Sequence, residues 1–349
     1  MMQRQSQQAR LIWTNARTSN CLDSAEAMSM MGGKAWSHLM KKSKFLISLS
    51  MQESPYQRLL ATVAQDTADR LGVEVEIVYA ANDAIKQGEQ LLKAIQSSAS
   101  DSRPDGILCS PVGTNMVQVA RHATAKGIGW TLLNRADDYI AELRKSCSVP
   151  VFCVGMDQEE IGRIQGQQFG VLLPQGGLVL YILGPNYSIA QQRLSGMQSA
   201  KPSNVEVRTL PGNWSEESGY KAVSAWLRLS TSETTPAALV AAQNDAMAMG
   251  ARRAFDELTG SARAHWIDLL FTGVDHSPGA GQEWVRKGLL AASVLSRPVT
   301  GVALEMFVQA IQAKSQPQIN TLLAPASFPE IGQLQEIRAR KGPFQFLSR

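Results

Sequence analysis

Apolar runs and amphipathic segments alternate along most of the chain. From Lys44 onward, short apolar runs such as KFLISLS (44–50) and VEVEIVY (73–79) predict strands. Between these two runs, apolar residues recur at three- and four-residue steps from Tyr56 to Leu71, which predicts a helix. Strands that alternate with helices of about 10–15 residues are typical of parallel βαβ units.

The alternation occurs twice, with a polar loop and Gly155 near the midpoint. This rhythm predicts an α/β fold of two doubly wound, Rossmann-like lobes with parallel sheets. The first half contains predicted strands at 44–50, 73–79, 106–110, 127–133 and 151–155, and the second contains apolar runs at 178–184, 204–210, 238–243 and 269–274.

Polar side chains follow several of these strands directly. Asn244 and Asp245 come after ALVAAQ, and Asp275 comes after LLFTGV. In an open parallel sheet, ligands bind outside the carboxyl ends of the strands. The local pattern therefore places these residues where a small molecule would bind.

The strand ends together carry a set of residues that suits a polyhydroxylated ligand. Asn, Asp and Arg offer planar hydrogen bonding to neighbouring hydroxyls, and an aromatic face can cover the C–H face of a sugar ring. The candidate ligand-binding residues are Tyr56, Asn134, Arg135, Gln191, Trp214, Asn244, Asp275 and Ser296.

Several of these residues have an equally ordinary structural interpretation. Arg135 could pair with a nearby acid, and Tyr56 could be a hydrophobic staple of its helix. Either Asn244 or Asp245 could cap the helix that follows. Arg193, close to Gln191, could be a structural partner, and Trp214 could pack between the lobes.

The sequence lacks the motifs of most enzyme classes. It contains no G-x-G-x-x-G loop after a strand, no G-x-x-x-x-G-K-[ST] loop and no G-x-S-x-G motif. The four histidines have no metal-ligand spacing. His276 follows Asp275, but no nucleophile that it could activate is recognisable. We therefore expect a protein that is not an enzyme and uses neither a cofactor nor a metal.

The charge of +4 is confined to the N-terminal region. Residues 1–43 hold six Lys/Arg and two Asp/Glu, and the rest of the chain holds 28 of each sign. A body without net charge does not attract nucleic acid or a membrane surface. No apolar run approaches the roughly 20 residues of a transmembrane helix.

Residues 1–43 contain no apolar run of the length found in a signal peptide. They are expected to be a disordered extension or the product of an upstream start codon, with an arm that binds a partner as the alternative. The four cysteines do not form a disulfide framework, although Cys147 and Cys153 could lie close together.

Five sequence segments resemble type I periplasmic sugar-binding proteins of the ribose/galactose-binding group, whose fold also forms the sensor core of LacI-type repressors. The segments are SPYQ (54–57), NR (134–135), AQQRLSG (190–196), AAQNDAMAMGA (241–251) and FTGVDHSP (271–278), the last of which precedes GLLAASV. The resemblance extends from Lys44 to about Pro329. It implies two lobes joined by a three-crossing hinge, with a ligand bound between them.

The resemblance also implies roles for the candidate residues. Tyr56 and Trp214 would stack on a sugar, while polar side chains would bind its hydroxyls. Those polar residues would be Asn134, Arg135, Asn244 and Asp275.

Four positions depart from the pattern typical of ribose-binding relatives. Gln57 replaces a second aromatic, Asn134 replaces Asp, Gln191 replaces Arg, and Ser296 replaces Gln. The pocket is therefore expected to be less charged and less aromatic on one wall.

The resemblance suggests boundaries for the lobes. We expect lobe 1 to comprise residues 44–154 plus about 298–315, and lobe 2 to comprise 155–297 plus about 316–330. Residues 331–349 are interpreted as a polar C-terminal tail.

Two functions follow from this interpretation. The first is a monomeric solute-binding protein of the periplasm that captures a small polar ligand, with a monosaccharide as the expected class, for an ABC transporter permease. The alternative is a cytoplasmic ligand sensor of the same fold that signals through a partner. A LacI-type repressor is disfavoured because residues 1–43 show no helix-turn-helix pattern.

Overall fold

The computed structural model describes residues 42–97, 103–113, 116–229, 236–260, 263, 266 and 269–341. The chain divides into two units, Met1–Lys42 and Ser43–Arg349, and nearly all described residues belong to the second. The prediction for residues 1–43 therefore lies almost entirely outside the described residues, as do Cys21 and the end of the predicted tail.

Lobe 1 is built on a six-stranded sheet with the order β11-β5-β4-β3-β1-β2, in which every neighbouring pair is parallel. The strands are β1 (Lys44–Leu49), β2 (Glu74–Tyr79), β3 (Gly106–Cys109), β4 (Gly129–Leu133), β5 (Val151–Met156) and β11 (Asn320–Leu323).

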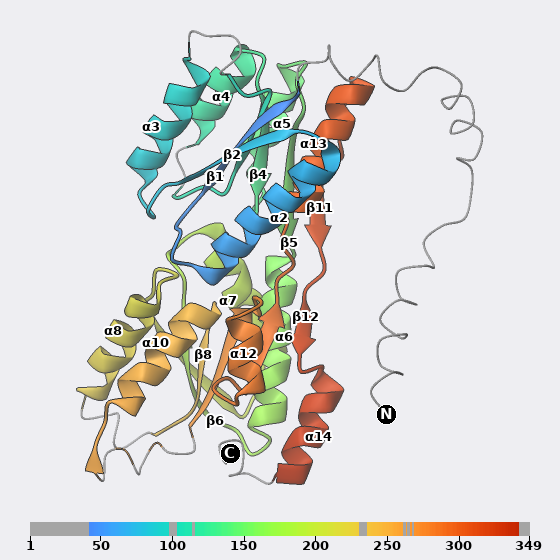
Figure 1. Ribbon diagram of the computed structural model, residues 1–349. Helices are drawn as coiled ribbons and strands as arrows, with labels where there is room; N and C mark the ends of the chain where they lie inside the picture. Colours follow the sequence, from blue (N-terminus) through green and yellow to red (C-terminus); the bar gives the residue numbers. More distant parts are fainter. Residues whose placement is uncertain are drawn as a thin grey trace, which may run out of the picture. The chain divides into compact units, whose positions relative to one another are not determined.

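Helices cover both faces of this sheet (Figure 1), and each set packs an apolar layer against it. Helices α2 (Pro55–Leu71) and α13 (Thr300–Ala313) pack with the strands around Phe307. Helices α3 (Ala84–Ile95), α4 (Val117–Ala125) and α5 (Tyr139–Lys145) pack on the other face around Trp130.

Lobe 2 repeats the arrangement with the strand order β12-β10-β9-β8-β6-β7. All neighbouring pairs are parallel except β10 and β12, which are antiparallel. The strands are β6 (Gly177–Ile182), β7 (Val205–Leu210), β8 (Ala237–Ala242), β9 (Leu270–Asp275), β10 (Ala292–Leu295) and β12 (Ala326–Phe328).

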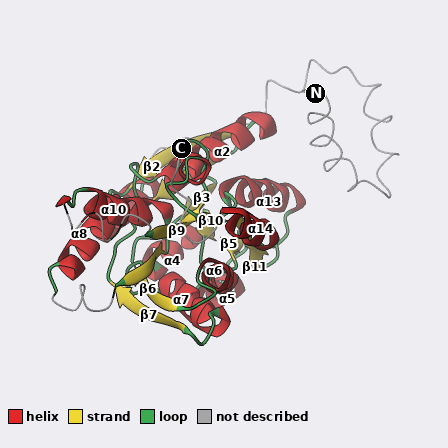
Figure 2. Ribbon diagram, turned by 90° about the horizontal axis from the view of Figure 1, so that it is seen from below, coloured by secondary structure: helices red, strands yellow, loops and turns green. Residues whose placement is uncertain are grey.

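Helices also cover both faces of the lobe 2 sheet (Figure 2). One face packs against α8 (Glu216–Leu227), α10 (Asp245–Asp256) and α12 (Gly281–Arg286). The other packs against α6 (Gln158–Leu172), α7 (Ser188–Ala200) and α14 (Ile331–Lys341). The expected α/β fold of two parallel, doubly wound lobes is confirmed.

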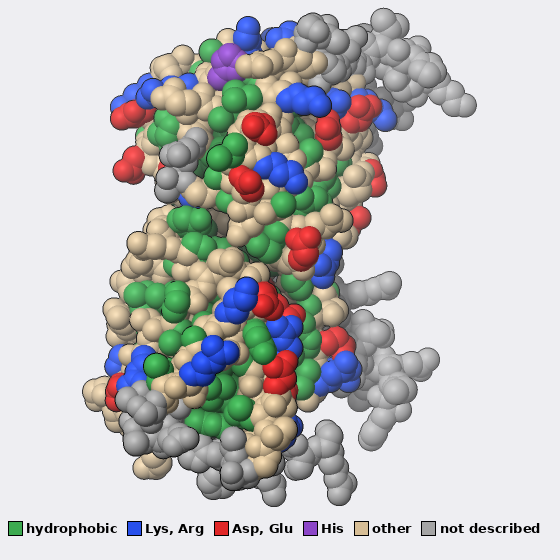
Figure 3. All heavy atoms as spheres, turned by 90° about the vertical axis from the view of Figure 1, so that its left-hand side faces the viewer, with side chains coloured by type: hydrophobic (Ala, Val, Ile, Leu, Met, Phe, Trp, Pro, Cys, Tyr) green, Lys and Arg blue, Asp and Glu red, His purple; other side chains and the backbone are tan. Residues whose placement is uncertain are grey.

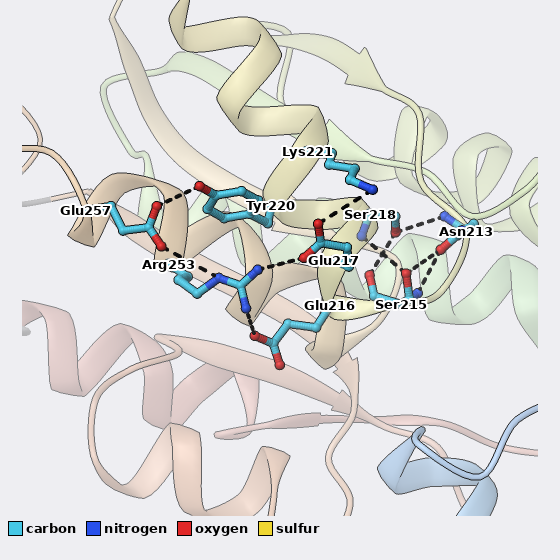
Figure 4. A network of polar contacts seen from close by, with 9 residues as sticks. All are labelled: Asn213, Ser215, Glu216, Glu217, Ser218, Tyr220, Lys221, Arg253 and Glu257. Carbon is cyan, nitrogen blue, oxygen red and sulfur yellow. Dashed lines mark hydrogen bonds and ion pairs between the residues drawn. The ribbon is translucent and has the colours of Figure 1, made fainter.

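The helices α8 and α10 approach so closely that two contact positions require glycine. A Cβ on Gly250 would lie 1.8 Å from the Glu216 carbonyl oxygen, and one on Gly219 would lie 2.1 Å from the Met247 carbonyl oxygen. On the exposed side of this contact, Arg253 donates 2.9 Å hydrogen bonds to both Glu216 and Glu217 (Figure 4).

The chain crosses between the lobes three times: from β5 to α6, from β10 to α13, and from β11 to β12. Because β5 and β10 pair with β11 and β12, all three crossings lie at the same edge of the two sheets. This edge is the hinge, and the opposite edges, formed by β2 and β7, lie farthest from it.

Three segments differ from the sequence-based assignment. Strand β11 pairs with β5 in lobe 1, whereas the boundaries expected from the sequence place all of residues 316–330 in lobe 2. Residues 331–341 form α14 rather than a tail, and the fully buried Leu334 packs that helix against lobe 2. The polar loop before Pro150 contains α5, which buries Ile140 and Leu143.

Candidate functional site: a cavity between the two sheets

The main cavity lies between the carboxyl ends of the two sheets and encloses about 820 Å³ of empty space, including open solvent at its mouth. Figure 3 views the molecule from the side opposite the hinge and shows it hollowed between the lobes. Seven of the eight candidate residues line this cavity: Tyr56, Asn134, Arg135, Trp214, Asn244, Asp275 and Ser296.

Tyr56 links lobe 1 to the hinge at the base of the cavity. Ser54 caps helix α2 by accepting a hydrogen bond from the Gln57 N–H (3.4 Å), and Pro55 occupies the first turn. The Tyr56 hydroxyl lies 3.1 Å from Asn134 Oδ1 and 3.2 Å from the carbonyl oxygen of Arg297. Burial raises the pKa of Tyr56, so the hydroxyl keeps its proton and donates it.

Asn134 and Arg135 lie at the carboxyl end of β4. Asn134 has a positive φ of 65° and points its side chain into the cavity lining, with Nδ2 unengaged by any described residue. Arg135 donates two hydrogen bonds to Asp137 (2.5 and 3.0 Å) and one to the Gly113 carbonyl (2.7 Å). The acid partner that the sequence allowed for Arg135 is therefore Asp137.

Arg193 is tied to the hinge by a chain of buried polar groups. Its Nε donates to Gln158 Oε1 (2.8 Å), and Nη1 donates to the Gln243 carbonyl. Gln158 in turn donates from Nε2 to the Asn134 carbonyl (3.0 Å). The buried side chain of Gln158 thus links the end of β4 in lobe 1 to Arg193 in lobe 2.

The Asn244 side chain makes two hydrogen bonds to the backbone of neighbouring segments. Its Oδ1 caps α10 by accepting from the Met247 N–H (2.9 Å), and its Nδ2 donates to the Trp214 carbonyl (2.8 Å). Trp214, at a positive φ of 72°, lies over Gly184, where an added Cβ would come within 2.1 Å of the indole ring. The Arg193 guanidinium lies 5.5 Å from the indole centroid, within cation–π range.

Two neighbouring carboxylates, Asp275 at the end of β9 and Asp245 at the start of α10, differ in their partners. Asp245 is buried and accepts hydrogen bonds from the His276 N–H (2.8 Å) and the Ser293 hydroxyl (2.7 Å). It therefore neither caps its helix nor lines the main cavity. The Asp275 carboxylate does line the cavity and accepts no hydrogen bond from a described residue.

The electrostatics of this pair follow from burial. Burial raises the pKa of Asp275 to about 7, while the nearby Arg193 opposes the rise. Burial and the adjacent Asp275 charge raise the pKa of Asp245 well above its ordinary value, and the two donated hydrogen bonds oppose that rise.

Ser296 lies next to Asp275 at the inner end of the cavity. Its backbone N–H donates to the Asp275 carbonyl (3.3 Å), and its side chain is only 2% exposed. The buried hydroxyl has no hydrogen-bond partner among the described residues. A buried polar group without a partner is costly, so this hydroxyl is suited to meet a polar group from a ligand.

Gln191 does not line the cavity. It is exposed on α7, and its amide donates to the Asn186 side chain (2.7 Å). Two residues farther along, Arg193 faces the cavity instead, because positions two apart on a helix point in very different directions.

Sequence reasoning also missed several lining residues. Gln158 begins α6 and Tyr187 directly precedes α7, and neither position carried a signal of its own. Met51, Pro111 and Val112 belong to the loops after β1 and β3. The loops after β1 and β3 could have been singled out by the same strand-end rule that identified Asn244 and Asp275.

Other chemistry is limited among the residues described. Cys109, Cys147 and Cys153 are free thiols, and burial raises the pKa of Cys109 to about 12. The described part of the chain contains no cluster of three or more His, Cys, Asp or Glu side chains that could hold a metal ion. Among the same residues, no helix is both long and apolar enough to cross a membrane.

The chain matches one protein family and is similar to several solved structures. A family profile described as "Periplasmic binding protein domain" matches residues 45–315. The chain is similar in structure to a solute-binding protein of an ABC transporter from Actinobacillus succinogenes with bound D-allose. The TM-score is 0.71 at 19% identity, over 84% of this chain and 100% of that one.

Two further structures are similar over nearly their whole length. A myo-inositol-binding protein from Caulobacter has a TM-score of 0.68 at 22% identity, over 84% of this chain and 95% of that one. A fructose-binding periplasmic domain of a hybrid two-component system has a TM-score of 0.67 at 21% identity, over 85% and 95%. A search of curated proteins found no match.

Proposed function

Because the chain belongs to the periplasmic binding protein domain family, we propose that it captures a monosaccharide or a similar polyol in the interlobe cavity and delivers it to an ABC transporter. The structural neighbours with bound D-allose and myo-inositol support a ligand of this chemical class. The proposal places the protein in the periplasm, acting as a monomer that binds its ligand without chemical conversion.

One observation carries the ligand class. The Asp275 carboxylate faces the cavity and accepts no hydrogen bond from a described residue, although it is largely removed from water. A ligand with adjacent hydroxyl groups supplies donors for both carboxylate oxygens. The free Ser296 hydroxyl and the Asn134 amide extend this polar surface on either side.

The remaining candidate residues have supporting roles in this proposal. Trp214 offers an indole face to the C–H surface of a sugar ring. Asn244 holds Trp214 through its backbone carbonyl, and Arg193 lies against the indole ring. Gln191, exposed and bonded to Asn186, has no direct role in this proposal.

A screen of ligands by thermal shift, followed by calorimetric titration, tests the ligand class. A sugar present at one hundred times its dissociation constant is expected to stabilise the folded protein by about 2.7 kcal/mol. Amino acids, dicarboxylates and nucleosides serve as comparison classes. If one of these binds and no sugar or polyol does, the proposal is wrong.

A second function is supported by the fructose-binding domain of a two-component system, which has a similar fold. In that alternative, the protein senses the same ligand and signals through a partner rather than a permease. Fractionation of the native cells distinguishes the two. A protein found wholly in the cytosol would exclude delivery to a transporter.

A further inference from the structure

Among the described residues, two arginine side chains line the cavity, and they differ in how fully the protein uses them. Each of the three nitrogens of Arg135 donates a hydrogen bond to another residue of lobe 1. Arg193 donates from Nε to Gln158 (2.8 Å) and from Nη1 to the Gln243 carbonyl, but its Nη2 has no partner in the described part of the chain. Arg193 therefore keeps a nitrogen that can donate to a ligand.

The free nitrogen of Arg193 borders the cavity rather than the packed interior. The polar atoms that protein encloses without a partner do not include Arg193 Nη2, although the residue is only 7% exposed. Nη2 is thus among the few atoms of Arg193 that reach open space, and the space that Arg193 lines is the cavity. Because Gln158 and Gln243 are themselves buried, the guanidinium is held in this direction before a ligand binds.

The Asp275 carboxylate is the acidic counterpart of Arg193 within lobe 2. Asp275 ends β9 at a positive φ of 111°, a strained conformation of the kind that functional sites retain. The two charges are close enough to act on each other: burial lowers the pKa of Arg193, and the Asp275 charge opposes that fall. Even so, no ion pair between described residues joins them, because Nε and Nη1 are directed to Gln158 and Gln243.

A hydroxyl group has the chemistry to join these two charged groups. A guanidinium can only donate hydrogen bonds and an ionised carboxylate can only accept them, whereas a hydroxyl does both at once. Hydrogen bonds to charged groups are also roughly twice as strong as those between neutral groups. An ether oxygen could accept from Arg193 but has no proton for Asp275, and a methylene group could serve neither residue.

We propose that Arg193 is a specificity-determining ligand contact, whose Nη2 donates to the same ligand hydroxyl that donates its proton to Asp275. This inference rests on the proposed sugar-binding function and adds to it a binding residue and an orientation of the ligand. One ring position must carry a free hydroxyl, and sugars that are deoxygenated or O-methylated at that position are rejected.

Deoxy sugars identify the position of this hydroxyl. The parent compound is whichever of D-allose, D-galactose, D-fructose, L-arabinose and myo-inositol binds most tightly, and it is compared by calorimetric titration with its monodeoxy derivative at each hydroxyl position. The derivative that lacks the bridging hydroxyl is expected to bind about 100-fold more weakly than the parent, because two charged groups lose their partner. Derivatives at the other positions are expected to lose about tenfold or less.

A pair of arginine variants connects this loss to Arg193. Arg193→Lys keeps the positive charge but removes Nη2, and it is expected to raise the dissociation constant of the parent compound about 30-fold. Arg252→Lys is the matched control. Arg252 also donates to a backbone carbonyl (Leu289, 3.2 Å) and lies over an aromatic ring (Phe271, 5.3 Å), but it is outside the cavity lining. This control is expected to leave the dissociation constant unchanged.

The deoxy series separates a lost contact from a structural effect of Arg193→Lys. When two groups touch, the effects of removing each are not additive. Loss of the bridging hydroxyl is therefore expected to cost about tenfold in Arg193→Lys instead of about 100-fold, with the costs at other positions unchanged. Asp275→Asn is expected to reduce the cost at the same ring position.

A crystal structure of the wild-type protein with the parent compound tests the inference without any variant, and so also if Arg193→Lys does not fold. One oxygen of the compound is expected within about 3.2 Å of both Arg193 Nη2 and an Asp275 carboxylate oxygen. An oxygen that reaches only one of the two residues overturns the inference.

The outcomes also separate this inference from the function on which it rests. If a sugar or polyol binds but every deoxy position costs the same in Arg193→Lys as in the wild type, Arg193 does not touch the ligand, and sugar binding stands without it. If Arg193→Lys and Asp275→Asn reduce the cost at different ring positions, the shared hydroxyl is excluded. If no compound of the panel binds and another solute class does, the proposed function is wrong and this inference is wrong with it.

Discussion

The two walls of the cavity are both rich in polar residues, but they differ in what those residues already bind. On the lobe 1 wall, Arg135 is held by Asp137 and Gly113, and the loops after β1 and β3 are held by Gln57 and Gln87. On the lobe 2 wall, Asp275 and Ser296 have free hydrogen-bonding capacity.

This difference shows that a polar residue at a strand end is not by itself a binding residue. Many such residues satisfy the backbone of loops that would otherwise lose hydrogen bonds to water on burial. Asp245 and Asp275 illustrate the contrast within one lobe: the first stabilises the strand ends around it, and the second faces the cavity. Removal of a polar group that is already hydrogen-bonded should therefore reduce stability, whereas removal of a group with free capacity should reduce ligand affinity.

The largest effect is expected on the lobe 1 wall. Gln87→Leu removes hydrogen bonds to Ser48, Ser110 and Val112 and leaves buried backbone groups without partners. The free energy of unfolding should fall by about 3 kcal/mol. Urea denaturation measures it, with Gln65→Leu on the exposed face of α2 as the control. Equal stability of the two variants would remove the structural role given to Gln87.

On the lobe 2 wall, Asp275→Asn should weaken ligand binding and leave the fold intact. Loss of charge-assisted hydrogen bonds is expected to raise the dissociation constant about 100-fold. The melting temperature should stay level or rise, because the variant lacks a half-buried carboxylate that accepts no hydrogen bond from a described residue.

The matched variant for this test is Asp137→Asn on the other wall. Asp137 pairs with Arg135 and does not line the cavity. The Asp137→Asn variant should change the dissociation constant by less than about threefold and lower the free energy of unfolding by about 1 kcal/mol. If Asp137→Asn weakened binding while Asp275→Asn did not, the contrast between the walls would be reversed.

Local sequence patterns were sufficient to predict most elements of the fold. The strand and helix rhythm is a property of neighbouring residues, so the helix expected from Tyr56 to Leu71 is found as α2, and the parallel βαβ units follow from the alternation. Strand pairing depends on distant partners, which explains the assignment of β11 to the wrong lobe. Helix α14 was missed because its stability comes from packing of Leu334 against lobe 2.

The candidate site could be predicted only in part for the same reason. Asn134, Asn244 and Asp275 lie at the end of a strand or within two residues of it, so a local rule placed them at the carboxyl edge of a sheet. The rule could not show that Asp245 turns toward His276 and Ser293, or that Gln158 connects the two lobes. Those contacts depend on tertiary packing, which no short stretch of sequence encodes.

The raised pKa of Asp275 predicts that pH acts on stability and on binding with opposite signs. The pKa of this group is about 7 in the folded chain and near its ordinary value of 3.8 when unfolded. Folding therefore favours the protonated acid, and stability should fall as pH rises from 4 to 7 and then level off.

Ligand binding should instead strengthen from pH 4 to pH 7, because the ionised carboxylate is the better acceptor.

The Asp275 carboxyl accounts for about 2 kcal/mol of the change in stability between pH 4 and pH 7, after allowance for its partial exposure and for the neighbouring Arg193 and Asp245. Denaturation at several pH values, with Asp275→Asn as the reference, measures this part. A wild-type profile parallel to that of the variant would show that Asp275 does not titrate in this range.

The smallest effect is expected at Ser296, where the two properties should again separate. Ser296→Ala removes a buried hydroxyl that has no partner in the described part of the chain, so stability should be unchanged or slightly higher. A hydroxyl that meets the ligand contributes about 1 kcal/mol, which corresponds to roughly a fivefold rise in the dissociation constant. Ser110→Ala on the opposite wall is the control and should change affinity less. Equal affinity losses in the two variants would mean that the inner end of the cavity is not the preferred polar contact, and that both walls bind the ligand alike.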